Sequence, residues 1–218
     1  MYRRIDNREM ARYQPAYPTK GWVHIPNAVP QEHIEMLREV GLQLRYKMDD
    51  LAGTPAKRGP EFYTEGDHKI VPCASSLDDR LMEVYRSQYM YEIVSRLFPA
   101  DKFYLFNDQI VYKLPNDNMG FIWHYDNQFG NAHQRGARTM NCMIIIDDIN
   151  EENGGLLLQD RDNSKERSIF PKAGDIVIVD GNTYHASADN IGDTPRGLYA
   201  CVYATKPLHF QNYYNEQF

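Results

Sequence analysis

The sequence is poor in cysteine and contains no long apolar run. Its three cysteines, Cys73, Cys142 and Cys201, are far apart and form no CxxC pair. This pattern argues against a disulfide framework and predicts free thiols in a reducing compartment, so we expect a cytoplasmic location. No segment reaches the roughly 18 consecutive apolar residues of a membrane span. The N-terminal MYRRIDNREMARYQP also lacks the apolar stretch of a secretory signal. We therefore expect no membrane partner.

An excess of positive charge is also lacking. The chain has 24 Lys and Arg against 30 Asp and Glu, which gives a formal net charge of -6. Neither nucleic acid nor an anionic membrane attracts an acidic protein at long range. We therefore expect a small-molecule partner and no nucleic acid, while the oligomeric state stays open. Internal repeats and low-complexity segments are missing too, and 218 residues suffice for one domain with a substantial core.

The first hundred residues read as helices around an irregular segment. Residues 21–29 (GWVHIPNAV) predict a short strand and turn, and Pro30 opens a helical stretch with apolar residues at helical spacing. Residues 51–76 are rich in Gly and Pro and contain only short apolar runs, which predicts a long irregular segment of the kind that often forms a lid. A second helix is expected over about 77–98.

Strand-like runs follow residue 100. They are rich in Val, Ile, Tyr and Phe, and they read KFYLFNDQIVYKL, FIWHYD, TMNCMIIID, GGLLLQD, DIVIVD and GLYACVYA. Several short strands with regular turn signals predict a sandwich or barrel. The fold class is therefore α+β, a jelly-roll (cupin-like) core with N-terminal helices packed on one face. We expect one domain over 1–218, with 1–100 as mainly helical support and lid and 101–206 as the jelly-roll core.

Three side chains form a candidate metal site. His124 and Asp126 lie in one strand-like run, where residues i and i+2 point to the same face, and His185 ends another run. HxD alone is a weak signal, because a surface histidine often precedes a solvated aspartate. Two His and one carboxylate leave other coordination positions open, which suits non-haem Fe(II) oxygenases. We therefore predict that His124, Asp126 and His185 are the metal-binding and catalytic residues.

The segment after His185 strengthens this interpretation. Ser187 lies on the same strand face as His185, and a loop bounded by Gly192 and Pro195 leads to Arg196 at the start of the next strand. The planar guanidinium of Arg196 can bind a carboxylate through two parallel hydrogen bonds, and Ser187 can donate a third. An exposed arginine at a strand end is the alternative for Arg196 taken alone. Its place after His185 and Ser187 favours a carboxylate site.

At these residues the sequence resembles the phytanoyl-CoA dioxygenase-like (PhyH-like) family of Fe(II)/2-oxoglutarate oxygenases. The resemblance covers about residues 21–204 and includes DDINEENGGLLLQ and KAGDIVIVDGNTYHASADN, with Arg196 eleven residues after His185. It implies a double-stranded β-helix fold, Fe(II), 2-oxoglutarate and O2, with ascorbate as reductant. It further implies that Arg196 and Ser187 grip the distal carboxylate of 2-oxoglutarate. Lys113, eleven residues before His124 as in ectoine hydroxylase, and Asn107 are further candidates for that co-substrate.

The resemblance implies hydroxylation of an unactivated C–H bond of a small molecule, with release of succinate and CO2. Retention of Asp126 favours hydroxylation, because halogenases in related families lack this carboxylate. Where the family often has Pro-Gly-Ser-His after its Asn-Gly turn, this chain has QDRDN at 159–163, so the substrate identity does not carry over. The candidate substrate-binding residues are Gln109, Asn127, Phe129, Arg138 and Tyr63.

Two alternatives remain open at this point. A cupin-like metal protein without 2-oxoglutarate turnover would normally show HxH and a later Glu, whereas this chain has HxD. Desaturation or cyclisation is a different outcome of the same oxygenase chemistry. Succinate formation from 2-oxoglutarate separates the first alternative from the oxygenase, and the structure of the product separates the second from hydroxylation.

Overall fold

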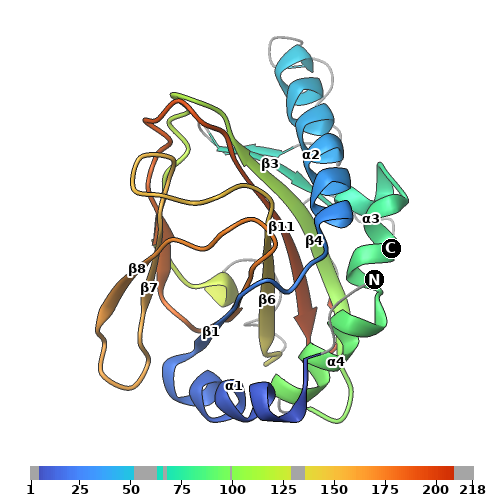
Figure 1. The fold of residues 1–218 in the computed structure, drawn as a ribbon, viewed down its shortest axis with the longest axis vertical. Helices are drawn as coiled ribbons and strands as arrows, with labels where there is room; N and C mark the ends of the chain where they lie inside the picture. The colour runs from blue at the N-terminus through green and yellow to red at the C-terminus, as the bar shows by residue number, and fades with distance from the viewer. Residues whose placement is uncertain (1–4, 52–62, 66–67, 99, 129–135, 209–218) are drawn as a thin grey trace.

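Two antiparallel sheets face each other in the computed structural model, which describes residues 5–51, 63–65, 68–98, 100–128 and 136–208 (Figure 1). In this part of the chain the larger sheet has seven strands and the smaller has four. In spatial order the larger sheet comprises β1 (Trp22–Ile25), β9 (Ile176–Asp180), β6 (Thr139–Ile145), β11 (Arg196–Ala204), β4 (Tyr104–Lys113), β3 (His68–Pro72) and β2 (Tyr63–Glu65). The smaller sheet comprises β5 (Phe121–His124), β10 (His185–Ser187), β7 (Leu156–Gln159) and β8 (Glu166–Ile169).

The helices lie outside the space between the sheets, along the larger sheet (Figure 1). They are α1 (Asn7–Lys20), α2 (Gln31–Leu51), the short 3-10 helix η1 (Ala74–Ser76), α3 (Arg80–Tyr85) and α4 (Gln88–Leu97). The sequence analysis did not predict α1, which contains two prolines. Its ends are nevertheless defined, because Asp6 caps the first turn and Gly21 ends the helix with a φ of 85°. Burial of Met10 and Tyr17 on one face holds it to the core.

The helix expected over about 77–98 is two helices. The first, α3, ends at Tyr85, and α4 begins at Gln88. Ser87 separates them because its backbone is extended and its Oγ accepts a hydrogen bond from the backbone N–H of Met90, 3.2 Å away. The expectation of one continuous helix was therefore wrong at this serine.

The segment 51–76 is less irregular than expected. Residues 52–62 lie outside the described part of the chain, but β2 and β3 follow them and extend the larger sheet beyond β4. Together with β1, they place three strands of the first hundred residues in this sheet. The polar strand β8, which was also not predicted, pairs only with β7. Strand β3 pairs with the distant strand β4, whereas β2 and β8 pair with β3 and β7, their neighbours in the sequence.

Hydrophobic side chains form two layers. On β11, Tyr199, Cys201 and Tyr203 face the helices and join the larger cluster. Leu198 and Ala200 alternate with them, face the smaller sheet and join the inner cluster. Helices thus cover one face of a two-sheet β core, as the sequence predicts, and the inner face of the larger sheet is left to line the space between the sheets.

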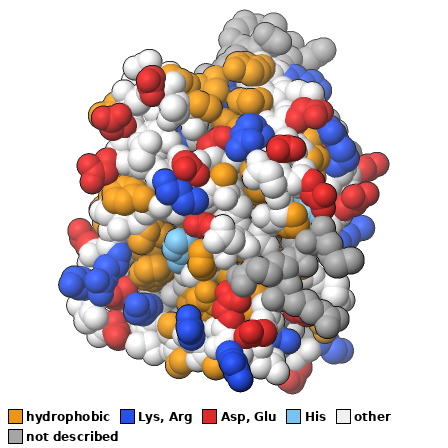
Figure 2. Space-filling model, in the orientation of Figure 1, with side chains coloured by type: hydrophobic (Ala, Val, Ile, Leu, Met, Phe, Trp, Pro, Cys, Tyr) orange, Lys and Arg blue, Asp and Glu red, His pale blue; other side chains and the backbone are white. Residues whose placement is uncertain are grey.

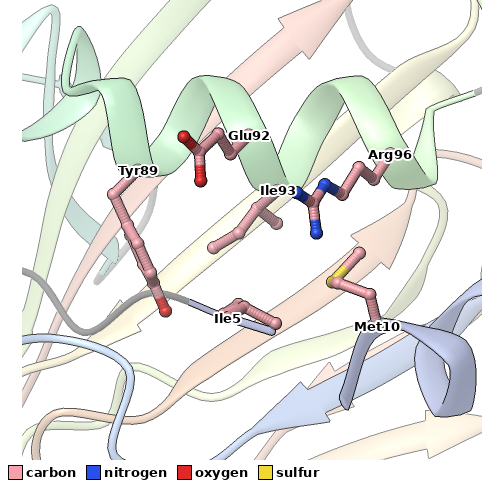
Figure 3. A pocket seen from close by; sticks show the side chains of 6 residues that line it. All are labelled: Ile5, Met10, Tyr89, Glu92, Ile93 and Arg96. Carbon is pink, nitrogen blue, oxygen red and sulfur yellow. The ribbon is translucent and has the colours of Figure 1, made fainter. Parts of the chain in front are cut away.

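Acidic and basic side chains are intermixed over the face shown in Figure 2. A shallow pocket lies between α1 and α4, lined by Ile5, Met10, Tyr89, Glu92, Ile93 and Arg96 (Figure 3). It contains none of the candidate site residues. Within the described residues, no helix combines the length and apolar character that crossing a membrane requires.

Candidate metal centre and carboxylate site

The smaller sheet brings the three predicted metal ligands together. His124 ends β5 and His185 begins β10, and the two residues pair directly in the antiparallel register. Their rings lie 4.2 Å apart between centroids. We expected Asp126 to continue the strand, but it begins the 3-10 turn η2 (Asp126–Gln128). The turn, rather than strand alternation, points its carboxylate back toward the two imidazoles.

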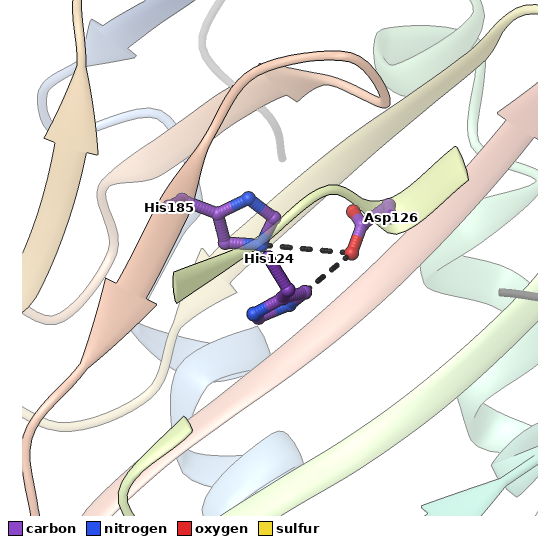
Figure 4. A group of neighbouring side chains, drawn as sticks. All are labelled: His124, Asp126 and His185. Carbon is purple, nitrogen blue, oxygen red and sulfur yellow. Dashed lines mark ion pairs between the residues drawn. The ribbon is translucent and has the colours of Figure 1, made fainter. Parts of the chain in front are cut away.

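The ligand atoms converge on one point (Figure 4). Asp126 Oδ1 lies 3.7 Å from His124 Nε2 and 3.5 Å from His185 Nε2. One ligand atom from each of the three residues lies within 4.8 Å of the others. Metal–ligand bonds of roughly 2.1 Å at right angles would place neighbouring ligand atoms about 3 Å apart. The three side chains therefore fit a single metal ion that they bind from one side.

Each imidazole is held in the same way. His124 Nδ1 lies 2.7 Å from the carbonyl oxygen of Ile122, and His185 Nδ1 lies 2.9 Å from that of Thr183. A carbonyl only accepts hydrogen bonds, so Nδ1 carries the proton on each ring and Nε2 keeps its lone pair. This orientation by an outer partner is typical of metal-ligating histidines.

Hydrogen bonds with β6 and with the turn after β9 fix the turn that carries Asp126. The backbone N–H of Asn127 donates to the carbonyl of Gly181 at 2.9 Å. Thr139 Oγ1 donates to Asn127 Oδ1 at 2.6 Å, and Asn127 Nδ2 donates to Asn182 Oδ1 at 2.9 Å. Asn127 was expected at the substrate wall. Because both ends of its amide are bonded within the protein, we instead assign it to the scaffold beneath Asp126.

A second group, Lys113, Ser187 and Arg196, lies deeper between the sheets. Lys113 ends β4 and pairs directly with Arg196, the first residue of β11. Lys113 Nζ donates to Ser187 Oγ at 2.8 Å and to the carbonyl of Ala188 at 2.6 Å, and it lies 5.3 Å from the centre of the Phe121 ring. Lys113 is fully buried and Arg196 is 1% exposed. Two basic side chains are thus enclosed side by side.

Burial shifts the pKa of both cations downward. The pKa of Lys113 falls to about 6, first because of desolvation and second because of the neighbouring Arg196. Desolvation likewise lowers the pKa of Arg196 to about 10. Among the described residues, Arg196 Nε and Nη2 are buried and have no hydrogen-bond partner. Buried charged donors without partners are costly, so this site fits an anionic ligand that supplies acceptors to both side chains.

The two groups are spaced for one small dianion. Ser187 follows His185 by two residues on β10, which places them about 7 Å apart along the strand. That separation is comparable to the length of a five-carbon dicarboxylate. The arrangement can therefore hold a metal at one end of such a molecule and its far carboxylate at the other, as 2-oxoglutarate requires.

The other predicted residues lie apart from these groups. Asn107, expected at the co-substrate, lies six residues before Lys113 on β4, about 20 Å along the strand. It accepts a hydrogen bond from the backbone N–H of Cys73 at 3.3 Å and donates to Gln109 at 3.4 Å. Asn107 therefore lies far along β4 from Lys113, and its predicted contact with 2-oxoglutarate stays a prediction. Gln109 lies two residues nearer to Lys113 on the same strand. Its amide nitrogen has no partner among the described residues.

The remaining substrate candidates divide in two. Arg138 Nη2 forms an ion pair with the buried Asp180 at 2.8 Å, so a protein carboxylate already balances its charge. Phe129 and the side chain of Tyr63 lie outside the described residues. Sequence reasoning also missed Asn141, which donates to Asp126 at 3.0 Å. The sequence feature that could have identified Asn141 is an amide side chain inside the otherwise apolar run TMNCMII.

Comparisons with known proteins identify a family and a fold. The family model for phytanoyl-CoA dioxygenase matches residues 17–198. Among solved structures, the 2-oxoglutarate-dependent (alpha-ketoglutarate-dependent) epimerase SnoN from nogalamycin biosynthesis superimposes with a TM-score of 0.73 and 16% identity. That match covers 91% of this chain and 83% of SnoN. The carbocyclase SnoK from the same biosynthesis has a TM-score of 0.72 and 17% identity, covering 95% of this chain and 88% of its own.

Another solved structure is EctD from S. alaskensis with bound Fe, with a TM-score of 0.72 and 16% identity over 95% of this chain and 81% of that chain. EctD has also been solved with 2-oxoglutarate and 5-hydroxyectoine. No curated protein matches the sequence. At this identity the structures establish the fold, and the predicted jelly-roll with helices on one face is confirmed.

Proposed function

The chain belongs to the phytanoyl-CoA dioxygenase family of Fe(II)- and 2-oxoglutarate-dependent oxygenases, and from this premise we propose that it hydroxylates a small molecule. The observation that carries the proposal is a His-Asp-His group joined through β10 to a buried Lys-Arg pair. His185 belongs to the first group, and Ser187, two residues and about 7 Å further along the strand, accepts a hydrogen bond from Lys113. His124, Asp126 and His185 would bind Fe(II). Arg196, Ser187 and Lys113 would bind the distal carboxylate of 2-oxoglutarate.

Each residue has a defined task in this mechanism. When bound, Fe(II) with 2-oxoglutarate and O2 supplies the oxidising power to attack an unactivated C–H bond, with succinate and CO2 as co-products. His124 Nε2, His185 Nε2 and Asp126 Oδ1 would hold the metal ion and would leave other coordination positions for the co-substrate and O2. Arg196 and Lys113 neutralise the far carboxylate and fix the co-substrate in one orientation. Gln109 offers its free amide N–H groups to the substrate from the inner face of β4.

The direct test is turnover of 2-oxoglutarate. Purified protein with Fe(II) and ascorbate, the expected reductant, should form succinate, and formation should rise when a substrate is added. Candidate small molecules are screened for coupled consumption of O2 and 2-oxoglutarate. If no succinate forms, and if 2-oxoglutarate causes no absorbance change with Fe(II) under anaerobic conditions, the proposal is wrong and a non-catalytic metal-binding protein is favoured.

A second outcome of the same chemistry has specific support. SnoN is an epimerase and SnoK a carbocyclase, and both share this fold. Product analysis distinguishes the outcomes. Hydroxylation adds one oxygen atom, cyclisation or desaturation removes two hydrogen atoms, and epimerisation leaves the mass unchanged.

A further inference from the structure

Asn141 is a buried amide in an apolar setting. It lies near the middle of β6 and is 6% exposed. Like Met143 two residues later, it faces the space between the sheets. Its direct neighbours in the larger sheet are Val202 on β11 and Val179 on β9. The side chains beside it on the sheet therefore offer it no hydrogen bond.

Among the described residues, the side chain of Asn141 forms one hydrogen bond, and it goes to a predicted metal ligand. Asn141 Nδ2 donates to Asp126 Oδ2 at 3.0 Å. Because an ionised carboxylate only accepts, the amide nitrogen must face Asp126 and Asn141 Oδ1 must point elsewhere. That oxygen is buried and has no partner within the described residues. Asn141 therefore bonds to Asp126 while its own amide oxygen stays unpaired within the described residues.

We propose that Asn141 is a positioning residue that occupies Asp126 Oδ2, so that Oδ1 alone is presented to the metal. This inference rests on the proposed function, because it assigns Asp126 as a ligand. The two oxygens of Asp126 already differ in this way. Oδ1 is the oxygen near both histidine Nε2 atoms, and Oδ2 is the oxygen that accepts from Asn141. Coordination through one oxygen keeps a further position open for the co-substrate and O2.

A purely structural role does not account for this amide. Thr139, two residues earlier on β6, supports the turn directly through its bond to Asn127. Asn141 bonds neither to the backbone nor to any residue of the turn other than Asp126. A leucine of similar shape would fill the same space without burying an unpartnered carbonyl. The amide is explained by its effect on Asp126, since outer partners orient the ligands of a metal site.

The test measures metal binding rather than turnover. Asn141→Leu is compared with wild type for Mn(II) affinity by titration calorimetry, without co-substrate. We expect affinity to fall roughly ten- to a hundredfold. The visible absorption spectrum of the Co(II)-loaded variant should also change shape, because the freed Oδ2 can then approach the metal. Val202→Ala, in the same row of the sheet, alters packing without touching Asp126 and should change neither readout.

The possible outcomes separate the two proposals. If wild-type protein binds no Mn(II), the proposed function itself fails. If wild type binds Mn(II) and Asn141→Leu binds it equally well with an unchanged Co(II) spectrum, the positioning role is overturned. Equal losses in Asn141→Leu and Val202→Ala would also overturn it, because packing alone would explain them. If the leucine variant does not fold, Asn141→Ser carries the same test, since serine is too short to reach Asp126.

Discussion

Lys113 and Arg196 face each other across β4 and β11, the two longest strands of the larger sheet, and both are essentially fully buried. His124 and Asp126 lie instead at the end of a four-residue strand and in the turn after it, with side chains 13% and 23% exposed. The carboxylate end of the site is thus part of the core, whereas the metal end depends on a few local hydrogen bonds. We therefore expect the two ends to respond independently to mutation.

The largest effect is expected at His185, which is one proposed ligand and pairs with another, His124. His185→Ala should abolish retention of Fe(II) and all turnover, because two remaining ligands hold the metal too weakly. Iron content is measured after anaerobic loading and gel filtration. His24→Ala is the control, because His24 pairs with Asp175 and is not one of the three grouped ligands. Full iron content in His185→Ala would remove this residue from the metal centre.

Arg196→Leu should break the carboxylate end alone. Loss of charged hydrogen bonds should weaken 2-oxoglutarate binding by about 3 kcal/mol, roughly a hundredfold, while Mn(II) affinity stays the same. Calorimetry on the Mn(II)-loaded protein measures both constants. Arg138→Leu removes an equal charge from the ion pair with Asp180 and should leave 2-oxoglutarate affinity unchanged. An unaltered affinity in Arg196→Leu would exclude Arg196 from the site.

The depressed pKa of Lys113 predicts a pH dependence confined to the carboxylate end. Above its pKa of about 6, Lys113 is neutral in the free protein. A bound carboxylate stabilises the ammonium form and raises this pKa, so binding takes up a proton. Affinity for 2-oxoglutarate should therefore fall as pH rises above 6, by up to about tenfold per unit, until the pKa of the complex is reached.

Lys113→Met tests this assignment, because methionine has a similar shape and does not titrate. In this variant the pH dependence above 6 should disappear, and calorimetry in two buffers of different ionisation enthalpy should show no proton uptake. If wild type and variant share the same pH dependence, the titrating group lies elsewhere.

The smallest effect is expected for Asn127, which supports the turn that carries Asp126. Asn127→Ala removes two side-chain hydrogen bonds from the turn that carries Asp126, each contributing about 1 kcal/mol. Because part of that loss affects the turn and part the whole fold, Mn(II) affinity should fall only severalfold. Affinity for 2-oxoglutarate in the metal-loaded protein should be little changed. A larger loss at the carboxylate end would show that the two ends are coupled.

Local sequence patterns were sufficient to predict an element where one property, such as apolar character, dominates the whole segment. The apolar runs that became β6, β9 and β11 predicted buried strands, because continuous burial requires continuous apolar sequence. Boundaries were less predictable. Ser87 divides one expected helix in two, and β3, with which β2 pairs, extends the sheet by pairing with β4, about 40 residues later. A capping hydroxyl and a distant partner strand do not change the local hydrophobic period.

By itself, the sequence determined the ligand types and their order along the chain: His124, Asp126 and His185, then Ser187 and Arg196. Only the tertiary structure decided how they meet. Pairing of β5 with β10 sets the two histidines side by side, and a 3-10 turn, not a strand, aims Asp126 at them. Pairing of β4 with β11 buries Lys113 against Arg196, and β6 brings Asn141 to Asp126. These contacts join residues of different strands, so register and burial, which no local pattern contains, determined the site.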